Sequence, residues 1–254
     1  MLRVFVGLAS LVGALSLAAP ALTSPAATIK GQGWLPHQRG VDWTYSWKDS
    51  TYSPTATKEK VTLSTASGSA FTLAWTSANL GNPTTAVSGD GTVSFQETDS
   101  GLINTNWSSS PPPTAFPVLC EQATSCGNSL ASFYYNVIWG SRQPTLAEPL
   151  LGGTSWTTTG GAQNDVGGTS VYLGTQSISV PAFSRPVRAA EIRTQLSQVG
   201  AIGDPYGSGV RTVWWVYGVG PVKMVYRHAG GANAPVTSGE LLSTDLVPQA
   251  PPPD

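Results

Sequence analysis

The chain has 254 residues, of which 11% are charged, and its 13 basic and 14 acidic side chains give a formal net charge of −1. Such a balance gives no electrostatic basis for binding nucleic acid or an anionic membrane surface. Sparse charge with 28 glycines, 20 prolines and abundant serine and threonine is typical of an extracellular β-protein with many turns.

Residues 1–26 have the features of an export signal. Arg3 is the only early charge, and residues 4–19 form an uninterrupted run of 16 apolar or small residues. This run is short for a membrane helix, which needs about 20 apolar residues. We therefore expect a cleaved signal, removed after Ala21 or after Ala26, rather than a permanent anchor.

Alternation of apolar and polar residues predicts a meander of strands in the N-terminal half. The clearest alternation has Val41, Trp43, Tyr45 and Trp47 on one face. Further strands are expected at residues 59–65, 70–76, 91–97 and 101–107. The short polar connections between the second and third, and between the fourth and fifth, are typical of hairpin turns.

The middle of the chain is harder to assign. Residues 109–117 contain four prolines, which cannot donate hydrogen bonds to a sheet, so we expect a crossover or linker there. The apolar run at residues 130–139 fits a short helix or a strand, and we favour a short helix. Residues 188–199 stay open between a helix and a strand, because their apolar spacing is helical but their surroundings are rich in β-signals.

Cys120 and Cys126 are the two cysteines of the chain and enclose five residues. In an oxidising compartment we expect them to form a disulfide, which for so short a loop contributes about 2.4 kcal/mol in the chain-entropy description. A reactive or metal-binding pair is the alternative, but the spacing is not Cys-x-x-Cys and no histidine is near. Since no cysteine precedes Cys120, we expect no lipid attachment and a soluble, secreted mature protein.

One spacing recurs along the chain. Pro36, Gly40, Trp43 and Thr44 have the same mutual separations as Pro149, Gly153, Trp156 and Thr157. If the match is not chance, it indicates two related half-sheets, each opened by a Gly-x-x-Trp-Thr strand. Residues 168–180, after the second copy, predict a long hairpin or a bent strand.

The stretch W-W-V-Y-G-V-G-P-V-K at residues 214–223 predicts a strand, a glycine turn and a return strand. Trp215 and Tyr217 share one face, whereas Trp214 lies on the other. A strand with one covered face should alternate cleanly between apolar and polar residues, and this strand does not. Both faces must therefore meet something apolar, which is either a second layer of structure or a ligand.

Signatures of catalysis and metal binding are missing from the sequence. It contains no Gly-x-Ser-x-Gly elbow and no clustered histidines and cysteines, and the scattered carboxylates single out no pair for glycoside hydrolysis. The two histidines, His37 and His228, are interpreted as exposed strand-end or loop residues. We therefore favour a protein without enzyme activity, cofactor or metal; a hydrolase using paired carboxylates is the weakest alternative.

The nine tryptophans are the remaining signal, since indoles fill cores, stack on sugars or line apolar pockets. As ligand contacts we expect Trp43, Trp75, Trp214, Trp215 and Tyr217, with plain core filling as the competing interpretation for Trp43 and Trp75. The expected function is binding of an apolar, lipid-like ligand in a sheet cavity, in the bacterial cell envelope or outside it. A carbohydrate-binding or wall-associated module with exposed tryptophans is the alternative.

Residues 214–223 resemble the W-x-A-P-G-V-G-x-V-K signature of a broad group of uncharacterised bacterial exported proteins and lipoproteins. Residues 34–45, 149–156 and 179–182 resemble further short motifs of that group, although Val216 and Tyr217 stand where it has Ala-Pro. The resemblance implies a strongly curved antiparallel sheet, similar to the half-barrels of periplasmic lipoprotein carriers, with a concave apolar face. It implies no catalytic residues.

Together these observations predict a mainly β protein whose curved antiparallel sheet forms a half-barrel or an open barrel, with a short helix or two. We expect one domain over residues 27–247 and a disordered proline-rich tail at residues 248–254. No nucleic-acid partner and no integral membrane segment are expected after the signal is removed.

Overall fold

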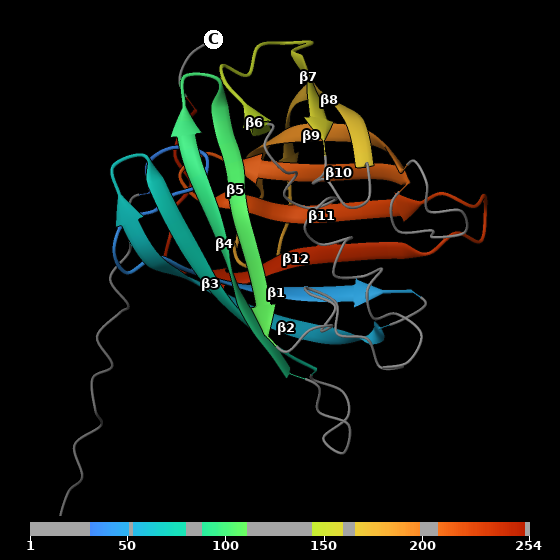
Figure 1. Cartoon of the computed structure of the whole chain (residues 1–254), viewed down its shortest axis with the longest axis horizontal. Coiled ribbons are helices and arrows are strands. Elements are labelled where there is room, and N and C mark those ends of the chain that lie inside the picture. The colour runs from blue at the N-terminus through green and yellow to red at the C-terminus, as the bar shows by residue number, and fades with distance from the viewer. Residues whose placement is uncertain are drawn as a thin grey trace, which may run out of the picture.

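The computed structural model describes residues 31–50, 53–79, 88–110, 144–159, 166–198 and 208–251. All regular structure within these residues is β, in twelve strands of one antiparallel sheet (Figure 1). The predicted fold class is therefore confirmed. The predicted signal, both cysteines and the run at residues 130–139 lie outside the described residues, so those expectations stay predictions.

The sheet consists of two successive groups of six strands. The first group is β1 (Asp42–Asp49), β2 (Ser53–Ser67), β3 (Ala70–Asn79), β4 (Ser88–Thr98), β5 (Gly101–Ser110) and β6 (Pro144–Ala147). The second is β7 (Ser155–Thr159), β8 (Val166–Ile178), β9 (Val187–Gln198), β10 (Gly209–Val216), β11 (Gly220–His228) and β12 (Val236–Thr244). All five strands predicted for the N-terminal half are present as β1 to β5.

The order of the strands nearly closes the sheet into a barrel. It runs β6-β5-β4-β3-β2-β1-β12-β11-β10-β9-β8-β7, so the first and last strands pair in the middle and the two edge strands follow one another in the chain. Figure 1 shows β6 and β7 close together at the top of the molecule. We call the gap between these edge strands the seam.

The two groups of six strands begin in the same way, which supports the predicted half-sheets. The amide of Val41 donates to the carbonyl of Gln38, and at the repeat-related place Thr154 donates to Leu151. Each turn has a glycine at its third position, with φ of 91° in the first and 81° in the second. A positive φ there is what a type II turn requires, so the recurring glycine has a conformational cause.

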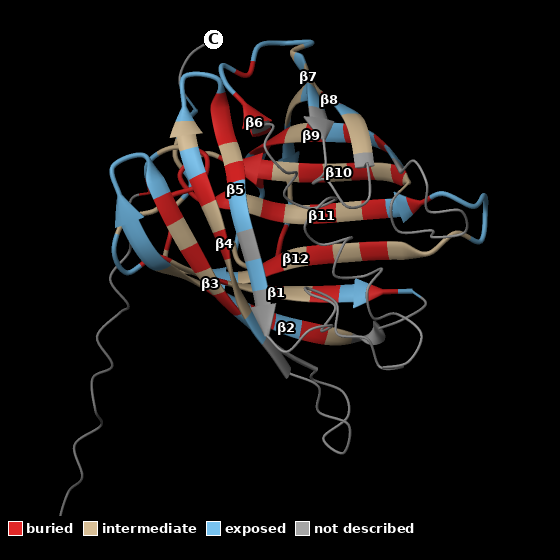
Figure 2. Ribbon diagram, in the orientation of Figure 1, coloured by how far each residue is buried: buried red, intermediate tan, exposed pale blue. Residues whose placement is uncertain are grey.

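The inner face of the barrel carries the core. Along β1 the inward side chains Trp43, Tyr45 and Trp47 are buried and alternate with partly exposed neighbours (Figure 2). Phe71 and Leu73 of β3 continue the same cluster. Burial of these large side chains, at about 25 cal/mol per Å² of apolar surface, is the main force that closes the sheet.

The second group of strands settles two expectations. Residues 188–199, left open between helix and strand, form β9 as far as Gln198. The bent strand expected at residues 168–180 is confirmed as β8, where the register shifts between Tyr172 and Gly174. Such a β-bulge bends one strand locally and increases its twist.

Three distant segments cross at one end of the barrel and form what we call the end cap: residues 31–35, the β10–β11 turn at 216–220, and residues 246–251. The amide of Gly218 donates to the carbonyl of Gly33 at 2.9 Å, and the amide of Gln249 donates to Tyr217 at 2.9 Å. Gln249, in the tail that we expected to be disordered, therefore takes part in this packing. This packing also accounts for Gly218 of the glycine-rich signature, since a Cβ at this position would lie 2.4 Å from Cγ of Gln249.

Candidate functional site

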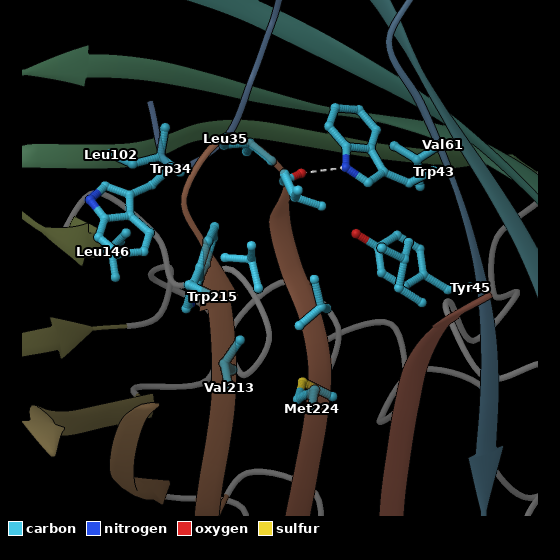
Figure 3. Packing of buried hydrophobic residues seen from close by; sticks show 14 of the residues in the cluster. Trp34, Leu35, Trp43, Tyr45, Val61, Leu102, Leu146, Val213, Trp215 and Met224 are labelled. Carbon is cyan, nitrogen blue, oxygen red and sulfur yellow. Dashed lines mark hydrogen bonds between the residues drawn. The ribbon is translucent and has the colours of Figure 1, made fainter. Parts of the chain in front are cut away.

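The five predicted ligand residues occupy different environments. Trp43 and Trp75 are core residues with exposed fractions of 1% and 2%; Trp75 packs so closely on Gly91 that a Cβ there would lie 2.5 Å from its ring. Trp215 lies in the barrel interior (Figure 3). The structure therefore does not gather these residues around one hollow, and their joint role as ligand contacts stays a prediction.

Trp214 and Trp215 lie on opposite faces of β10, as the sequence predicted. Trp215 points inward, whereas Trp214 lies partly buried on the outer face. There the Nζ atom of Lys223 lies 5.9 Å from the centre of the Trp214 ring and 2.8 Å from a carboxylate oxygen of Glu240. The outer face of this strand is thus covered in part by a cation–π contact and an ion pair of the same sheet, and not by the apolar second layer that we expected.

A large cleft with a described lining lies at the seam and has a volume of about 870 Å³. Its lining comes from the β6–β7 connection, β8, the start of β9 and the C-terminal segment. The residues are Trp34, Glu148, Pro149, Leu150, Leu151, Tyr172, Thr175, Pro186, Val187, Arg188, Pro248, Gln249, Ala250 and Pro251. We call it the mouth cleft; sequence reasoning placed no site there.

The end cap forms the back of the mouth cleft. Trp34 lines the cleft and meets Tyr217 edge-on, with ring centres 5.3 Å apart. Gln249, which also lines the cleft, is held by the backbone hydrogen bond to Tyr217. Tyr217 therefore contacts two residues of the cleft lining, Trp34 and Gln249. In this way the signature turn borders the mouth cleft, although Trp214 and Trp215 do not line it.

The rim of the mouth cleft combines an exposed apolar residue with charged groups. Leu151 and Leu173 are the exposed large apolar side chains among the described residues, at 47% and 52%, and only Leu151 lines the cleft. Arg188 and Glu148 lie at the same rim. Partial burial, and secondly the nearby charge of Glu97, raise the pKa of Glu148 above its ordinary value.

A second, much smaller hollow of about 40 Å³ lies inside the barrel and is called the inner cavity below. It is lined by Tyr45, Trp47, Glu59, Val61, Val213, Trp215, Pro221, Lys223, Met224 and Gly239. In Figure 3, Trp215 and Tyr45 lie on either side of the strand that carries Met224. The cavity contains one buried acid, Glu59, which the sequence analysis did not single out.

A row of inward polar residues crosses the sheet at the end of the barrel opposite the end cap. In register order these residues are Asp49, Thr237, Tyr226, Arg211, Thr194 and Ser170. Thr237 donates to Asp49 at 2.6 Å and contacts His228 at 2.9 Å. His228, interpreted from the sequence as exposed, is in fact buried, and that interpretation was wrong because its strand continues the covered inner face.

Arg211 in this polar row is a buried cation. Its Nη2 donates to the Thr194 hydroxyl at 2.9 Å, and that hydroxyl also contacts Ser170 at 2.8 Å. Burial lowers the pKa of Arg211 to about 10, against the opposing effect of Tyr226. The guanidinium therefore stays charged at neutral pH and is stabilised by hydroxyl groups of neighbouring strands.

The described part of the chain has neither a cluster of metal ligands nor a membrane-spanning helix. No three His, Cys, Asp or Glu side chains there are arranged to hold a metal ion. No helix in the same part is long and apolar enough to cross a membrane.

The described strands define a nearly closed antiparallel barrel of twelve strands, with a core of buried side chains inside and the mouth cleft at the seam. Solved structures of similar arrangement exist. One is a proposed lipoprotein from Parabacteroides distasonis, 14% identical, with a TM-score of 0.43; the match covers 84% of this chain and 99% of that one. A proposed exported protein with a YmcC-like fold from Bacteroides fragilis is 10% identical, with a TM-score of 0.45 and the same two coverages.

A third similar structure is a β-barrel-like protein from Brucella abortus that consists of a domain of unknown function. It is 8% identical, with a TM-score of 0.40, and the match covers 82% of this chain and 97% of that one. No family model and no curated protein matches the chain.

Proposed function

We propose that this protein is an exported, non-enzymatic binding protein that holds an apolar, acyl-chain-like ligand in the mouth cleft. The observation that carries the proposal is the coincidence of three features at the seam. The mouth cleft, an exposed leucine and the gap between the two edge strands all lie there. Export rests on the signal-like residues 1–26 of the sequence.

Volume favours the mouth cleft over the barrel interior as the ligand site. Pockets for small molecules measure roughly 300–1,000 Å³, and the mouth cleft, at about 870 Å³, falls in this range. The inner cavity, at about 40 Å³, is far too small for an acyl chain. The binding region we expected inside the sheet is therefore proposed at its seam instead.

The lining of the mouth cleft fits a ligand with an apolar body and a polar end. Leu150, Tyr172 and Val187 offer apolar surface, and Trp34 closes the inner side. Arg188 supplies a positive charge at the rim, where the head of a fatty acid would lie. Burial of apolar ligand surface would provide most of the affinity, and the charged rim would orient the molecule.

Carbohydrate binding by exposed tryptophans has less support. Of the tryptophans whose side chains are described, Trp156 and Trp214 are partly buried, and the others are buried. Stacking on a sugar requires an open indole face. None of the described indoles is fully exposed, which favours an apolar ligand over a sugar.

Native mass spectrometry of gently purified protein tests the proposal. We expect a population of protein carrying a non-covalent adduct of lipid mass, and we expect added fatty acid to displace it. A protein that carries no adduct and takes up no fatty acid over a broad concentration range would show that the proposal is wrong.

A further inference from the structure

We propose that the inner cavity is a second binding site, which takes a small organic cation of the methylammonium type between Glu59 and the aromatic side chains of Tyr45, Trp47 and Trp215. No residue lines both the inner cavity and the mouth cleft. The proposal is therefore independent of acyl-chain binding.

Glu59 is the first reason for the proposal. The residue is 2% exposed, and the one hydrogen bond it makes to the described part of the chain comes from the Trp47 indole Nε1, at 2.5 Å from Oε2. No described Lys, Arg or His lies within ion-pair distance of it. Its sequence neighbours Lys58 and Lys60 point to the opposite, outer face, where Lys60 pairs with Asp42 at 3.5 Å.

A buried acid with so few partners is costly for a protein to keep. Burial of a carboxyl group costs several kcal/mol unless hydrogen bonds or an opposite charge compensate. A core built only for stability would place an apolar residue at this point of β2, as Val61 does two residues further along. The acid, directed into a hollow, therefore indicates a partner of positive charge.

The aromatic lining of the inner cavity specifies which kind of cation fits. Tyr45 and Trp47 have ring centres 6.1 Å apart, and Trp215 lines the same space. Aromatic side chains attract alkylammonium ions through their quadrupoles, and combined with one carboxylate they bind methylated amines. Ca²⁺ and Mg²⁺ need about six oxygen ligands, whereas the Tyr45 hydroxyl here already donates to Pro221 at 2.8 Å.

The size of the inner cavity limits the ligand to a few heavy atoms. One water molecule needs a cavity in which the volume open to the centre of a water-sized sphere is about 10–15 Å³. The inner cavity, at about 40 Å³, therefore has room for roughly three water molecules. Methylammonium fits that space. Gly239 helps to create it, because a Cβ at this position would lie 2.4 Å from the Trp47 ring.

Binding of the cation should be linked to protonation of Glu59. Burial raises the pKa of Glu59 well above its ordinary value, although the Trp47 hydrogen bond opposes the shift. The other titratable groups lining the cavity are Tyr45 of β1, whose pKa is also raised, and Lys223 of β11, whose ammonium pairs with Glu240. A cation would therefore bind more tightly as pH rises and Glu59 loses its proton.

Calorimetric titration with methylammonium chloride, at several pH values up to mildly alkaline so that Glu59 ionises within the series, tests the site, with sodium chloride at equal ionic strength and neutral methanol as comparison ligands. The wild type and Glu59→Gln, which keeps the shape of the side chain without its charge, are measured side by side. We expect saturable binding of methylammonium to the wild type only, with an affinity loss of at least about tenfold in the variant. Equal binding to both proteins, equal binding of sodium, or no binding would overturn the proposal.

Val213→Ile provides a second variant in case Glu59→Gln fails to fold. It keeps the carboxyl group and adds one methylene at the cavity wall, so we expect it to weaken methylammonium binding. Binding to this variant with wild-type affinity would also contradict the proposal. Uptake of a fatty-acid probe by each folded variant should stay unchanged, which separates failure of this site from failure of the mouth cleft.

Discussion

The indole Nε1 of Trp43 donates a hydrogen bond of 2.6 Å to the carbonyl oxygen of Val219, 176 residues further along the chain (Figure 3). The hydroxyl of Tyr45 bonds Pro221 across the same sequence separation. The opening strand β1 and the turn of the glycine-rich signature therefore form one structural unit. Two motifs that look unrelated in the sequence are bonding partners at the end cap.

Replacement of Trp43 by phenylalanine should lower the free energy of unfolding by about 1–3 kcal/mol, because a buried carbonyl loses its donor and the smaller ring leaves space. Urea denaturation measures the change. Trp214→Phe is the matched control, since Trp214 lies partly exposed on the outer face and should cost less. Equal losses in the two variants would show that the bond to Val219 contributes nothing specific.

Gly239→Ala should destabilise the protein by about 1–3 kcal/mol, the usual range for overpacking. The added methyl would lie 2.4 Å from the Trp47 ring, so either the ring or the backbone must move. Gly167→Ala in β8 is the control, because a Cβ there meets no atom within 4 Å. Thermal unfolding of both variants checks the prediction. A loss of thermal stability in Gly167→Ala without a loss in Gly239→Ala would contradict it.

Thr237→Val should cost about 1–3 kcal/mol, because it removes the hydroxyl that Asp49 and His228 share in the polar row. Valine has nearly the same shape, so the loss reports the hydrogen bonds rather than packing. Thr212→Val, on the partly exposed outer face of β10, is the comparison. We expect it to change the urea midpoint little, and a similar shift in both variants would remove the case for a stabilising network.

Glu59 should make stability depend on pH in a definite direction. Its pKa is raised in the folded protein and is ordinary, near 4.5, in the unfolded chain. Below pH 4.5 Glu59 holds its proton in both the folded and the unfolded state, and its contribution to the free energy of unfolding is most favourable. As pH rises further, the unfolded chain releases its proton first, so the free energy of unfolding falls by about 1.4 kcal/mol per pH unit until the folded pKa is reached.

Glu59→Gln removes this dependence, because glutamine does not titrate. Urea denaturation of both proteins over a series of pH values should show the variant gaining stability relative to the wild type as pH rises above 4.5. Parallel stability curves would mean that Glu59 titrates normally and is not confined in an apolar cavity.

Strands with large inward side chains could be predicted from the sequence, and strands with small or polar inward residues could not. β1 was clear because Trp43, Tyr45 and Trp47 alternate with polar residues. β12 was missed because its inward residues include Thr237 and Gly239, one in the polar row and one beneath a tryptophan ring. An apolar–polar alternation signals a strand only where the inner face is apolar.

The uncertainty over β9 has the same cause. Its inward residues Ile192, Thr194 and Leu196 are buried in alternation, but Thr194 belongs to the polar row. With a threonine at that place, the apolar residues that remain follow a helix-like spacing. Its pairing with β8 and β10 in the structure is what identifies it as a strand.

The candidate sites depend on contacts that no local pattern encodes. The mouth cleft joins segments from Trp34 to Pro251 because β6 and β7 come together at the seam. Glu59 looked like one more acid on a strand flanked by lysines. Its spacing of two residues from Val61 places both on one face of β2, but its position opposite Tyr45 beside a cavity is a product of the folded sheet.

Acyl-chain binding in the mouth cleft is tested by titrating a fluorescent fatty-acid probe into wild-type protein, Leu151→Asp and Leu173→Asp. Both variants place a charge at an exposed leucine, so stability should change little, but only Leu151 lines the mouth cleft. We expect saturable binding to the wild type and to Leu173→Asp, and at least about tenfold weaker binding to Leu151→Asp. No binding to the wild type, or equal affinities for all three proteins, would show that the mouth cleft is not an acyl-chain site.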